Sequence, residues 1–515
     1  MTSPLAHQFF QQTAAALPAK PYLTLGDRTL TFGDVDRLSD GLASELQAHC
    51  GVQRGDRVAV MLENSAELVI ALWATLKAGA ICVPLVATLK KEKLSFVVRD
   101  SGAKVVIAHV ANSDRVTEAI RESETTCGVV WAGERGAIPG RYLAEACAVA
   151  DGPGDTGVEA QDVCLIIYTS GSTGEPKGVM LTHANVCNNA AAITGYLRNT
   201  QADVILCVLP LCYSYGLYQI LGGAYVGYTC LIEKSFAYPQ DVLQRAAARK
   251  FTGLAGVPAL FNTLLQLAPF DGIDLSSLRY MTNAAAPLAP SHIVQLATAL
   301  PGVEFFSMYG LTECTRVCYL DPAKATRKPA SVGQAMPNCS VFIVDEDGAP
   351  VPNGEAGELV VRGPNVMRGY WNRPEETARA LREGPMPGEK VLFTGDIFRL
   401  DEEGDLHFVG RKDDVFKSGG VKVSPRELEI VLYELEAVAE AAVVGVPDRG
   451  DIAIKAFIVL REGHALTEAM VRKHCKERLE AILVPKSIEL RASLPTTESG
   501  KISKAQLRRE QAVQA

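Results

Sequence analysis

At 515 residues the chain is too long for one ordinary hydrophobic core, so two or more domains are expected. Its hydrophobic content of 48%, charged content of 21% and net charge of −8 suit a soluble globular protein and disfavour a general nucleic-acid-binding surface. The 13 cysteines show no CxxC spacing, and several lie in apolar stretches, which predicts buried thiols in a reducing, cytoplasmic setting. No basic segment followed by an apolar one opens the chain, so no signal peptide is expected.

Strand-like apolar runs alternate with amphipathic helical runs through most of the chain. The expected strands are 57–61, 80–84, 104–108, 128–131, 163–168, 204–208 and 229–232, and the expected helices are 65–77, 241–249 and 259–267. This alternation predicts an α/β fold with mostly parallel sheets. The stretch 204–232 carries no formal charge and is long enough to span a bilayer, but its glycines, tyrosines and proline favour strand, loop, buried helix and strand, so no membrane span is expected.

The pattern changes after Pro329. Strands at 341–344, 357–361 and 406–409 are separated by acidic turns, which predicts a small, more antiparallel β subdomain. From Ser424 the pattern indicates a compact α+β unit with helices at 425–435 and 467–482 and strands at 440–446, 452–460 and 487–490. The charged stretch 410–414 between them suits a hinge. We therefore expect a large N-terminal domain, residues 1–410, and a small mobile C-terminal domain, residues 411–515.

The most informative segment is the ten-residue run from Thr169 to Gly178, which is rich in hydroxyl groups and glycine. Small residues let backbone N–H groups approach an anion closely, while hydroxyls and the ammonium of Lys177 add donors. It is not a Walker A loop, because Pro176 precedes the lysine and neither Ser nor Thr follows it. A flexible linker would not need a fixed proline and lysine. The run predicts a polyphosphate-binding loop made by Thr169, Ser170, Gly171, Ser172, Thr173, Gly174 and Lys177.

Three further segments carry groups suited to a nucleotide. In Tyr309–Glu313, a hydroxyl next to a carboxylate can hold a phosphate and Mg²⁺ together, and Tyr309 offers a flat face for a purine. The small-residue bend Asn283–Pro287 is suited to flanking a base. Asp396, placed at the end of a strand at 391–393, can accept two ribose hydroxyls, and Arg411 adds a cation.

Two lysine segments follow the expected hinge. Lys417 precedes Gly419 and Gly420, which allow a narrow passage or a special backbone conformation. Lys501 stands in a loop framed by proline and glycine near the C-terminus. A lysine in such a tail is usually only solvated, and its role here depends on the motifs upstream.

In order and spacing, these segments resemble the AMP-forming, adenylate-forming superfamily from about Thr31 to Lys501. That superfamily comprises acyl-CoA synthetases, aryl-CoA and coumarate ligases, luciferases and peptide-synthetase adenylation domains. Further matches are Gly357–Gly363, Gly369–Trp371 and Ser331–Gly333. The resemblance implies an ATP- and Mg²⁺-dependent ligase that joins a carboxylate to ATP as acyl-AMP and then moves the acyl group to the thiol of CoA.

The resemblance also implies a role for each matching residue. Lys501 would contact the carboxylate and the α-phosphate during adenylation, and Lys417 with Gly419 and Gly420 would border the thiol tunnel after the C-terminal domain rotates about Asp413. The catalytic residues would be Lys501, Thr312, Glu313 and Lys417, with Glu313 holding the metal. The ATP-binding residues would also include Ala285, Ala286, Pro287, Tyr309, Gly310, Asp396 and Arg411.

The acid pocket implied by the resemblance comprises Tyr213, Leu217, Asn283, Ala284 and Gly310. No acidic residue lies between 204 and 232 to pair an α-ammonium, so a standard α-amino acid is disfavoured. Tyr213 stands where many relatives have His, and Ala284 where Gly is frequent, so a short or aromatic acid is favoured over a long fatty chain. Two alternatives remain: a stand-alone adenylating enzyme that loads a carrier-protein phosphopantetheine, and a non-catalytic nucleotide-binding protein.

Overall fold

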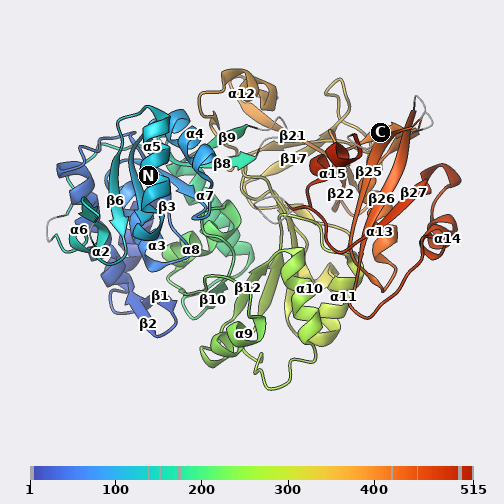
Figure 1. Cartoon of the computed structure of the whole chain (residues 1–515), viewed down its shortest axis with the longest axis horizontal. Coiled ribbons are helices and arrows are strands. Elements are labelled where there is room, and N and C mark those ends of the chain that lie inside the picture. Colours follow the sequence, from blue (N-terminus) through green and yellow to red (C-terminus); the bar gives the residue numbers. More distant parts are fainter. Residues whose placement is uncertain are drawn as a thin grey trace.

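The computed structural model describes residues 5–136, 138–149, 152–170, 175–418, 421–448, 451–496 and 502–512. In this part of the chain, a large N-terminal domain with two mostly parallel sheets and an antiparallel sheet precedes a smaller C-terminal domain (Figure 1). The expected fold class is therefore confirmed. All 13 cysteines are free thiols, and most are buried, as predicted.

One mostly parallel sheet contains the strands that begin and end the hydroxyl- and glycine-rich run. In spatial order it comprises β19 (Gly369–Tyr370), β9 (Pro176–Thr182), β8 (Val163–Ser170), β4 (Ile81–Leu85), β3 (Arg57–Met61), β5 (Ala103–His109), β6 (Gly128–Ala132) and β7 (Arg141–Tyr142). The strands from β8 to β7 are parallel, whereas β9 and β19 run antiparallel to their neighbours. The apolar runs of β3, β4 and β8 are buried on both faces, as parallel strands covered by helices require.

The other mostly parallel sheet carries Asn283 and Tyr309 at the carboxyl ends of two neighbouring strands. Its order is β16 (Gln334–Ala335), β15 (Cys318–Tyr319), β14 (Glu304–Tyr309), β13 (Tyr280–Asn283), β12 (Gly253–Gly256), β10 (Val204–Cys207), β11 (Thr229–Ile232), β1 (Pro21–Leu25) and β2 (Arg28–Thr31). The strands from β14 to β1 are parallel. Ligands of open α/β sheets bind beyond the carboxyl ends of such strands.

Helices complete the N-terminal domain. They are α1 (Ala6–Ala16), α2 (Phe32–Ala48), α3 (Ala66–Lys77), α4 (Lys91–Ser101), α5 (Ser113–Ser123), α6 (Leu143–Ala146), α7 (His183–Tyr196), α8 (Ser214–Val226), α9 (Pro239–Ala248), α10 (Pro258–Leu267), α11 (Pro290–Ala299) and α12 (Pro374–Ala380). The main core joins side chains of both sheets to α1, α2, α3, α7 and α8. The stretch 204–232 folds as β10, α8 and β11, as predicted, and no described helix is both long and apolar enough to cross a bilayer.

The antiparallel sheet confirms the predicted β subdomain. It contains β17 (Ser340–Val344), β18 (Gly357–Arg362), β21 (Lys390–Leu400) and β20 (Leu381–Glu383), with β22 (Leu406–Arg411) paired to β21. The prediction that Asp396 lies at the end of a strand is wrong, because β21 continues through it to Leu400. Gly395 has a φ of +71° next to a register shift after Ile397, so the glycine bends a continuing strand and does not end it.

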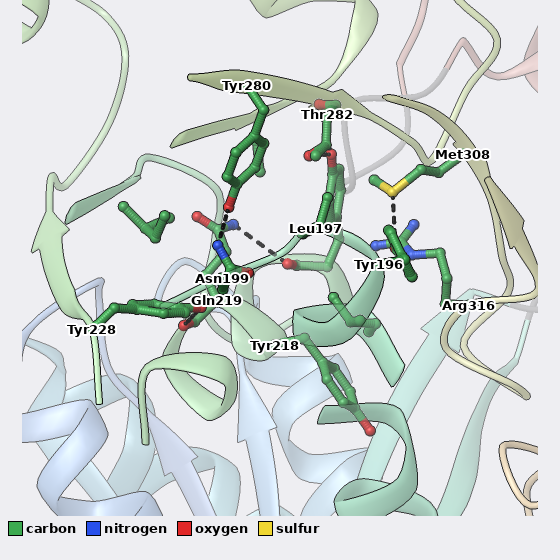
Figure 2. A pocket seen from close by; sticks show the side chains of 14 residues that line it. Tyr196, Leu197, Asn199, Tyr218, Gln219, Tyr228, Tyr280, Thr282, Met308 and Arg316 are labelled. Carbon is green, nitrogen blue, oxygen red and sulfur yellow. Dashed lines mark hydrogen bonds between the residues drawn. The ribbon is translucent and has the colours of Figure 1, made fainter. Parts of the chain in front are cut away.

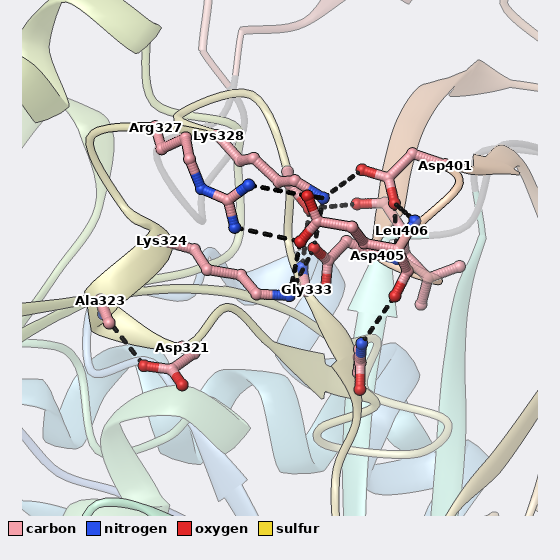
Figure 3. Close-up of polar contacts among 12 residues, drawn as sticks. Asp321, Ala323, Lys324, Arg327, Lys328, Gly333, Asp401, Asp405 and Leu406 are labelled. Carbon is pink, nitrogen blue, oxygen red and sulfur yellow. Dashed lines mark hydrogen bonds and ion pairs between the residues drawn. The ribbon is translucent and has the colours of Figure 1, made fainter.

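The turn of the β21–β22 hairpin is held by what we call the turn cluster, shown in Figure 3. Lys328 Nζ lies 2.8 Å from Asp401 Oδ2 and 2.7 Å from Asp405 Oδ2, and Lys324 Nζ lies 2.8 Å from the same Asp405 oxygen. Asp405 is only 1% exposed. The whole turn cluster comprises Lys324, Arg327, Lys328, Asp401, Glu403 and Asp405.

The C-terminal domain follows the predicted order of elements. It contains β23 (Phe416–Ser418), β24 (Val421–Val423), α13 (Pro425–Tyr433), β25 (Val438–Asp448), β26 (Asp451–Leu460), α14 (Glu468–Arg478), β27 (Ser487–Arg491) and α15 (Lys504–Ala512). Helix α14 ends at Arg478, earlier than the expected 482. The domain touches the N-terminal domain where Arg461 Nη2 lies 2.5 Å from His292 Nε2 on α11. Burial, and then the charge of Arg461, lower the pKa of His292 to about 4, so the neutral imidazole accepts this bond.

Candidate active site

Asp396 and Arg411 face each other on paired strands. They are register partners in β21 and β22, and Arg411 Nε lies 3.3 Å from Asp396 Oδ1. The carboxylate is 4% exposed, whereas the arginine side chain is 55% exposed. The structure thus brings together the two residues predicted to hold a ribose.

Tyr309 joins this pair from the carboxyl end of β14. Its hydroxyl donates a 2.6 Å hydrogen bond to Asp396 Oδ2, and its ring packs against Phe398 and Phe408. Burial, and then the charge of Asp396, hold the pKa of Tyr309 well above its usual 10, so the phenol stays protonated and donates. Stacking of a purine on Tyr309 stays a prediction.

Glu313 and Lys177 meet through Tyr370. The Tyr370 hydroxyl donates to Glu313 Oε1 over 2.8 Å, and Lys177 Nζ lies 5.5 Å from the centre of the same ring. Tyr370 reaches this place because β19 pairs with β9 beside Lys177. Burial, and then the charge of Glu313, raise the pKa of Tyr370. Lys177 from the predicted phosphate loop and Glu313 from the Tyr309–Glu313 segment therefore both lie against Tyr370.

The predicted phosphate loop connects two antiparallel strands. Thr169 and Ser170 end β8, and Lys177 stands opposite Thr169 on β9. The expected strand at 163–168 is confirmed as β8, and Pro176 begins the strand that returns beside it. The predicted loop residues Gly171, Ser172, Thr173 and Gly174 lie outside the described residues.

The bend after β13 lies beside the end of β14. Asn283 is 2% exposed and donates from Nδ2 to the Ala286 carbonyl over 3.1 Å. Ala285 has a φ of +70°, an uncommon conformation for a residue with a Cβ, and such strain is concentrated at functional sites. Because Asn283 is the register partner of Ser307, the bend and the Tyr309 segment leave the sheet together. The bend, which ends at Pro287, therefore lies beside the Tyr309 segment, and its contact with a nucleotide stays a prediction.

The remaining predicted residues are placed as follows. Thr312 is half-buried and adjoins Glu313, while Lys417 is exposed on β23 and Asp413 is exposed in the turn before it. Gly310 packs closely on the following loop, because a Cβ there would meet the Thr315 carbonyl oxygen at 2.3 Å. Gly419, Gly420 and Lys501 lie outside the described residues.

The structure holds a small cavity next to the predicted acid pocket. Leu217 is fully buried and Ala284 is 3% exposed. The cavity, of about 30 Å³, shares helix α8 and strand β13 with that pocket, but it is lined by Ile193, Tyr196, Leu197, Asn199, Ile205, Tyr215, Tyr218, Gln219, Tyr228, Ala255, Tyr280, Thr282, Met308 and Arg316 (Figure 2). Tyr213, at the start of α8, and the other predicted pocket residues are not among them.

Sequence reasoning missed three residues of this region. Tyr370 was part of a matching segment, but nothing local indicates that it contacts Glu313. Tyr215 and Gln219 are four residues apart on α8, and this spacing places them on one helix face. That spacing was a usable signal once the helix was expected.

The described residues contain no group of three or more His, Cys, Asp or Glu side chains that could hold a metal ion. Glu313 is a carboxylate without an ion pair to a described cation, and the Thr312 hydroxyl is its neighbour in the chain. Mg²⁺ is often held by one or two carboxylates together with substrate phosphates. The donors present therefore fit Mg²⁺ that is bound mainly through phosphate oxygens.

Comparisons with known proteins agree with this geometry. The pattern of the AMP-binding enzyme family matches residues 10–371, and that of the AMP-binding enzyme C-terminal domain matches residues 427–501. A feruloyl-CoA synthase of Amycolatopsis sp is 36% identical over 488 residues, covering 94% of both chains. A long-chain-fatty-acid–CoA ligase of Bacillus subtilis (strain 168) is 31% identical, covering 97% of this chain and 93% of the relative. The crystal structure of an anthranilate CoA ligase in complex with anthranoyl-AMP superposes with a TM-score of 0.90 at 28% identity, covering 100% of this chain and 98% of the other.

Proposed function

The chain belongs to the family of AMP-binding enzymes, and we propose that it activates a carboxylic acid with ATP as acyl-AMP and transfers the acyl group to CoA. It is an acid–thiol ligase of the acyl-CoA synthetase type. The observation that carries the proposal is the meeting of Lys177 and Glu313 at Tyr370. Two segments far apart in the sequence thereby place a cation and a carboxylate close together. Phosphate bound with Mg²⁺ requires both, a cation for the phosphate oxygens and a carboxylate for the metal.

The nucleotide is held from two sides in this proposal. Asp396 accepts the ribose hydroxyls, Arg411 adds a charge beside them, and the protonated Tyr309 keeps the carboxylate in position. Lys177 and the Thr312–Glu313 pair would contact the phosphates, and Glu313 would hold Mg²⁺, which would offset the phosphate charge. Holding the reacting groups in one geometry lowers the entropy cost of the reaction.

Adenylation requires a donor aimed at the charge that develops between the acid and the α-phosphate. We assign this role to Lys501, as the resemblance of its segment implies. A preorganised donor in such a place is worth about 10²–10³-fold in rate. The acid carboxylate attacks the α-phosphorus, and pyrophosphate leaves. The thiol of the acceptor then attacks the acyl carbon, and AMP leaves.

One lysine cannot serve both steps, so the domains take two relative positions. Residues 1–410 form the domain that binds ATP and the acid, and residues 411–515 rotate about Asp413. Lys417 and the Gly419–Gly420 pair then border the path of the thiol. The contact between Arg461 and His292 is one that such a rotation would break.

The acid is aromatic or short in this proposal. The feruloyl-CoA synthase and the anthranilate CoA ligase among the relatives act on aromatic acids by their names.

Mass spectrometry of reaction products tests the proposal. The protein is incubated with ATP, Mg²⁺ and a panel of aryl, short, medium and long acids, with and without CoA. We expect acyl-CoA from an aryl or short acid, and none from the Asp396→Ala variant. Acyl-AMP that accumulates in the presence of CoA would point to a carrier-protein thiol, and the absence of any acyl-AMP would reject the ligase.

A further inference from the structure

Arg316 is a buried cation in the wall of the cavity. It stands in the loop after β14, four positions beyond Thr312, and is 4% exposed. Figure 2 shows it reaching the cavity beside Tyr196. Its guanidinium carbon lies 4.9 Å from the centre of the Tyr215 ring, so one face of the arginine is covered by an aromatic face.

This arginine has no counter-charge in the described part of the chain. It forms no ion pair there, and its Nε has no hydrogen-bond partner. Arg279 provides an internal comparison, because it stacks 4.8 Å from the centre of the Tyr280 ring but pairs with Asp203 at 3.1 Å. Both arginines therefore stack on a tyrosine, but of the two only Arg279 also pairs with a described carboxylate.

Most other polar groups around the cavity already have partners. Tyr215 donates to the Thr282 carbonyl over 2.8 Å, and Tyr228 donates to the Gln219 carbonyl over 2.7 Å. The groups without a described partner besides Arg316 Nε are neutral, namely Gln219 Oε1 and the Tyr218 hydroxyl. The charge of Arg316 thus remains to be matched from outside the described residues.

We propose that the cavity receives a second carboxylate of the substrate, so that the acid activated here is a dicarboxylic acid whose distal carboxylate pairs with Arg316. This rests on the proposed ligase function and names its substrate class. Burying a cation without a counter-ion is costly, and an arginine fork matches a carboxylate in a bidentate way. A volume of about 30 Å³ accommodates about two water-sized groups, which is the requirement of two carboxylate oxygens.

The place of Arg316 suits this role. It follows Thr312 and Glu313 closely in the chain, and the loop that carries it packs against Gly310. One carboxylate of the acid can therefore react at the phosphate side while the other lies in the cavity. The same charge repels a substrate ammonium, which agrees with the lack of an acidic residue between 204 and 232.

Paired acids test the proposal. ATP–pyrophosphate exchange is measured with succinate against butanoate and with benzenedicarboxylates against benzoate, and kcat/KM is compared within each pair. We expect the wild-type protein to prefer the dicarboxylate in at least one pair. In Arg316→Gln, the ratio of kcat/KM for dicarboxylate to monocarboxylate should fall at least about thirtyfold, because a buried charge loses its partner.

A matched control is Arg382→Gln. Arg382 also covers an aromatic ring, with its guanidinium carbon 4.0 Å from the centre of the Phe393 ring, but it is exposed on the β subdomain, so the ratio should stay at the wild-type value. If Arg316→Gln does not fold, Arg316→Lys replaces it, because lysine keeps the charge but loses the planar fork. Its ratio of kcat/KM for dicarboxylate to monocarboxylate should still fall, but by less than the fall expected for Arg316→Gln.

The proposal is overturned if the wild-type protein shows no preference for a dicarboxylate, or if Arg316→Gln lowers kcat/KM equally for both acids of a pair. Exchange with a monocarboxylic acid alone would keep the ligase function and reject the substrate class. If no acid supports exchange, the ligase function fails. Calorimetric binding of the same acid pairs to both proteins then decides the role of Arg316 separately.

Discussion

Both ends of the β21–β22 hairpin carry a carboxylate paired with a cation, but the two ends differ in how far the cation is exposed to solvent. At the turn, Asp405 is 1% exposed and lies within 3 Å of Lys324 and Lys328. At the other end, Asp396 is also buried, but its cation, Arg411, is 55% exposed. Its second contact is the neutral hydroxyl of Tyr309. At the turn, cations contact the carboxylate from more than one side. At the other end, the arginine side of the pair is exposed to solvent.

This difference separates a structural cluster from a binding site. Carboxylates surrounded by ammonium groups have their charge matched, so the turn cluster fastens the hairpin to the segment after β15. A buried carboxylate whose paired arginine is exposed to solvent keeps acceptor capacity for hydroxyl groups of a ligand. We therefore expect substitutions at the turn to affect stability and substitutions at the open end to affect nucleotide binding and catalysis.

The largest effect is expected for the donor that the C-terminal domain adds to the open end. Lys501→Ala should reduce acyl-AMP formation by about 10²–10³-fold, because the developing charge loses a preorganised donor. Pyrophosphate release measures this step. Transfer from supplied acyl-AMP to CoA should continue, since that step uses the other domain position. An equal loss of adenylation and of acyl transfer would contradict the assignment of Lys501 to the adenylation step alone.

The turn cluster should respond through stability. Asp405→Asn leaves Lys324 and Lys328 without their shared buried carboxylate, and we expect a loss of about 2–3 kcal/mol in the free energy of unfolding, somewhat below the range for fully buried pairs because both lysines are partly exposed. Urea unfolding measures it. The Kd for ATP should stay at the wild-type value. The isosteric Asp347→Asn change in an exposed turn is the control.

The open end should respond through affinity. Asp396→Asn keeps the shape of the side chain but removes the charge, so the Kd for AMP should rise about tenfold or more as a charge-assisted hydrogen bond becomes neutral. Calorimetry with AMP measures the change. A variant that binds AMP normally but unfolds more easily would place Asp396 with the structural carboxylates and remove the distinction between the two ends.

Acid should release the turn cluster selectively. Hydrogen bonds from Arg327 and Lys328 lower the pKa of Glu403 to about 2. Burial alone would raise the pKa of Asp405, but Lys324 and Lys328 outweigh it and lower the pKa below its usual value. The unfolded chain thus takes up these protons first, so the stabilisation is complete above about pH 5, begins to fall near pH 4, and is lost as the pH falls through the lower folded values. The Tm difference between wild type and Asp405→Asn should narrow below pH 4, and a constant difference would contradict this.

Local patterns predicted the elements well, because alternation and helical spacing are set by neighbouring residues. They also singled out Asp396 and Arg411, although Gly395 suggested a turn where a bent strand continues. The contact of Tyr370 with Glu313 depends on how β19 pairs with β9, and no local pattern encodes such pairing. Arg316 was visible as a charge in an apolar stretch, but its lack of a partner becomes evident only from the packing around it.

The smallest effect is expected where the open end meets the C-terminal domain. In the described part of the chain, Asp414 and Val415 donate their N–H groups to the Arg411 carbonyl, whereas the Asp413 N–H takes part in no such backbone bond. Asp413→Pro therefore removes no described hydrogen bond but fixes φ at the expected hinge. Adenylation should change little and acyl transfer should slow, as single-turnover kinetics of each step can show. Asp413→Ala, which leaves φ free, is the control. Unchanged transfer in the proline variant would place the hinge elsewhere and leave Arg411 on a rigid strand end.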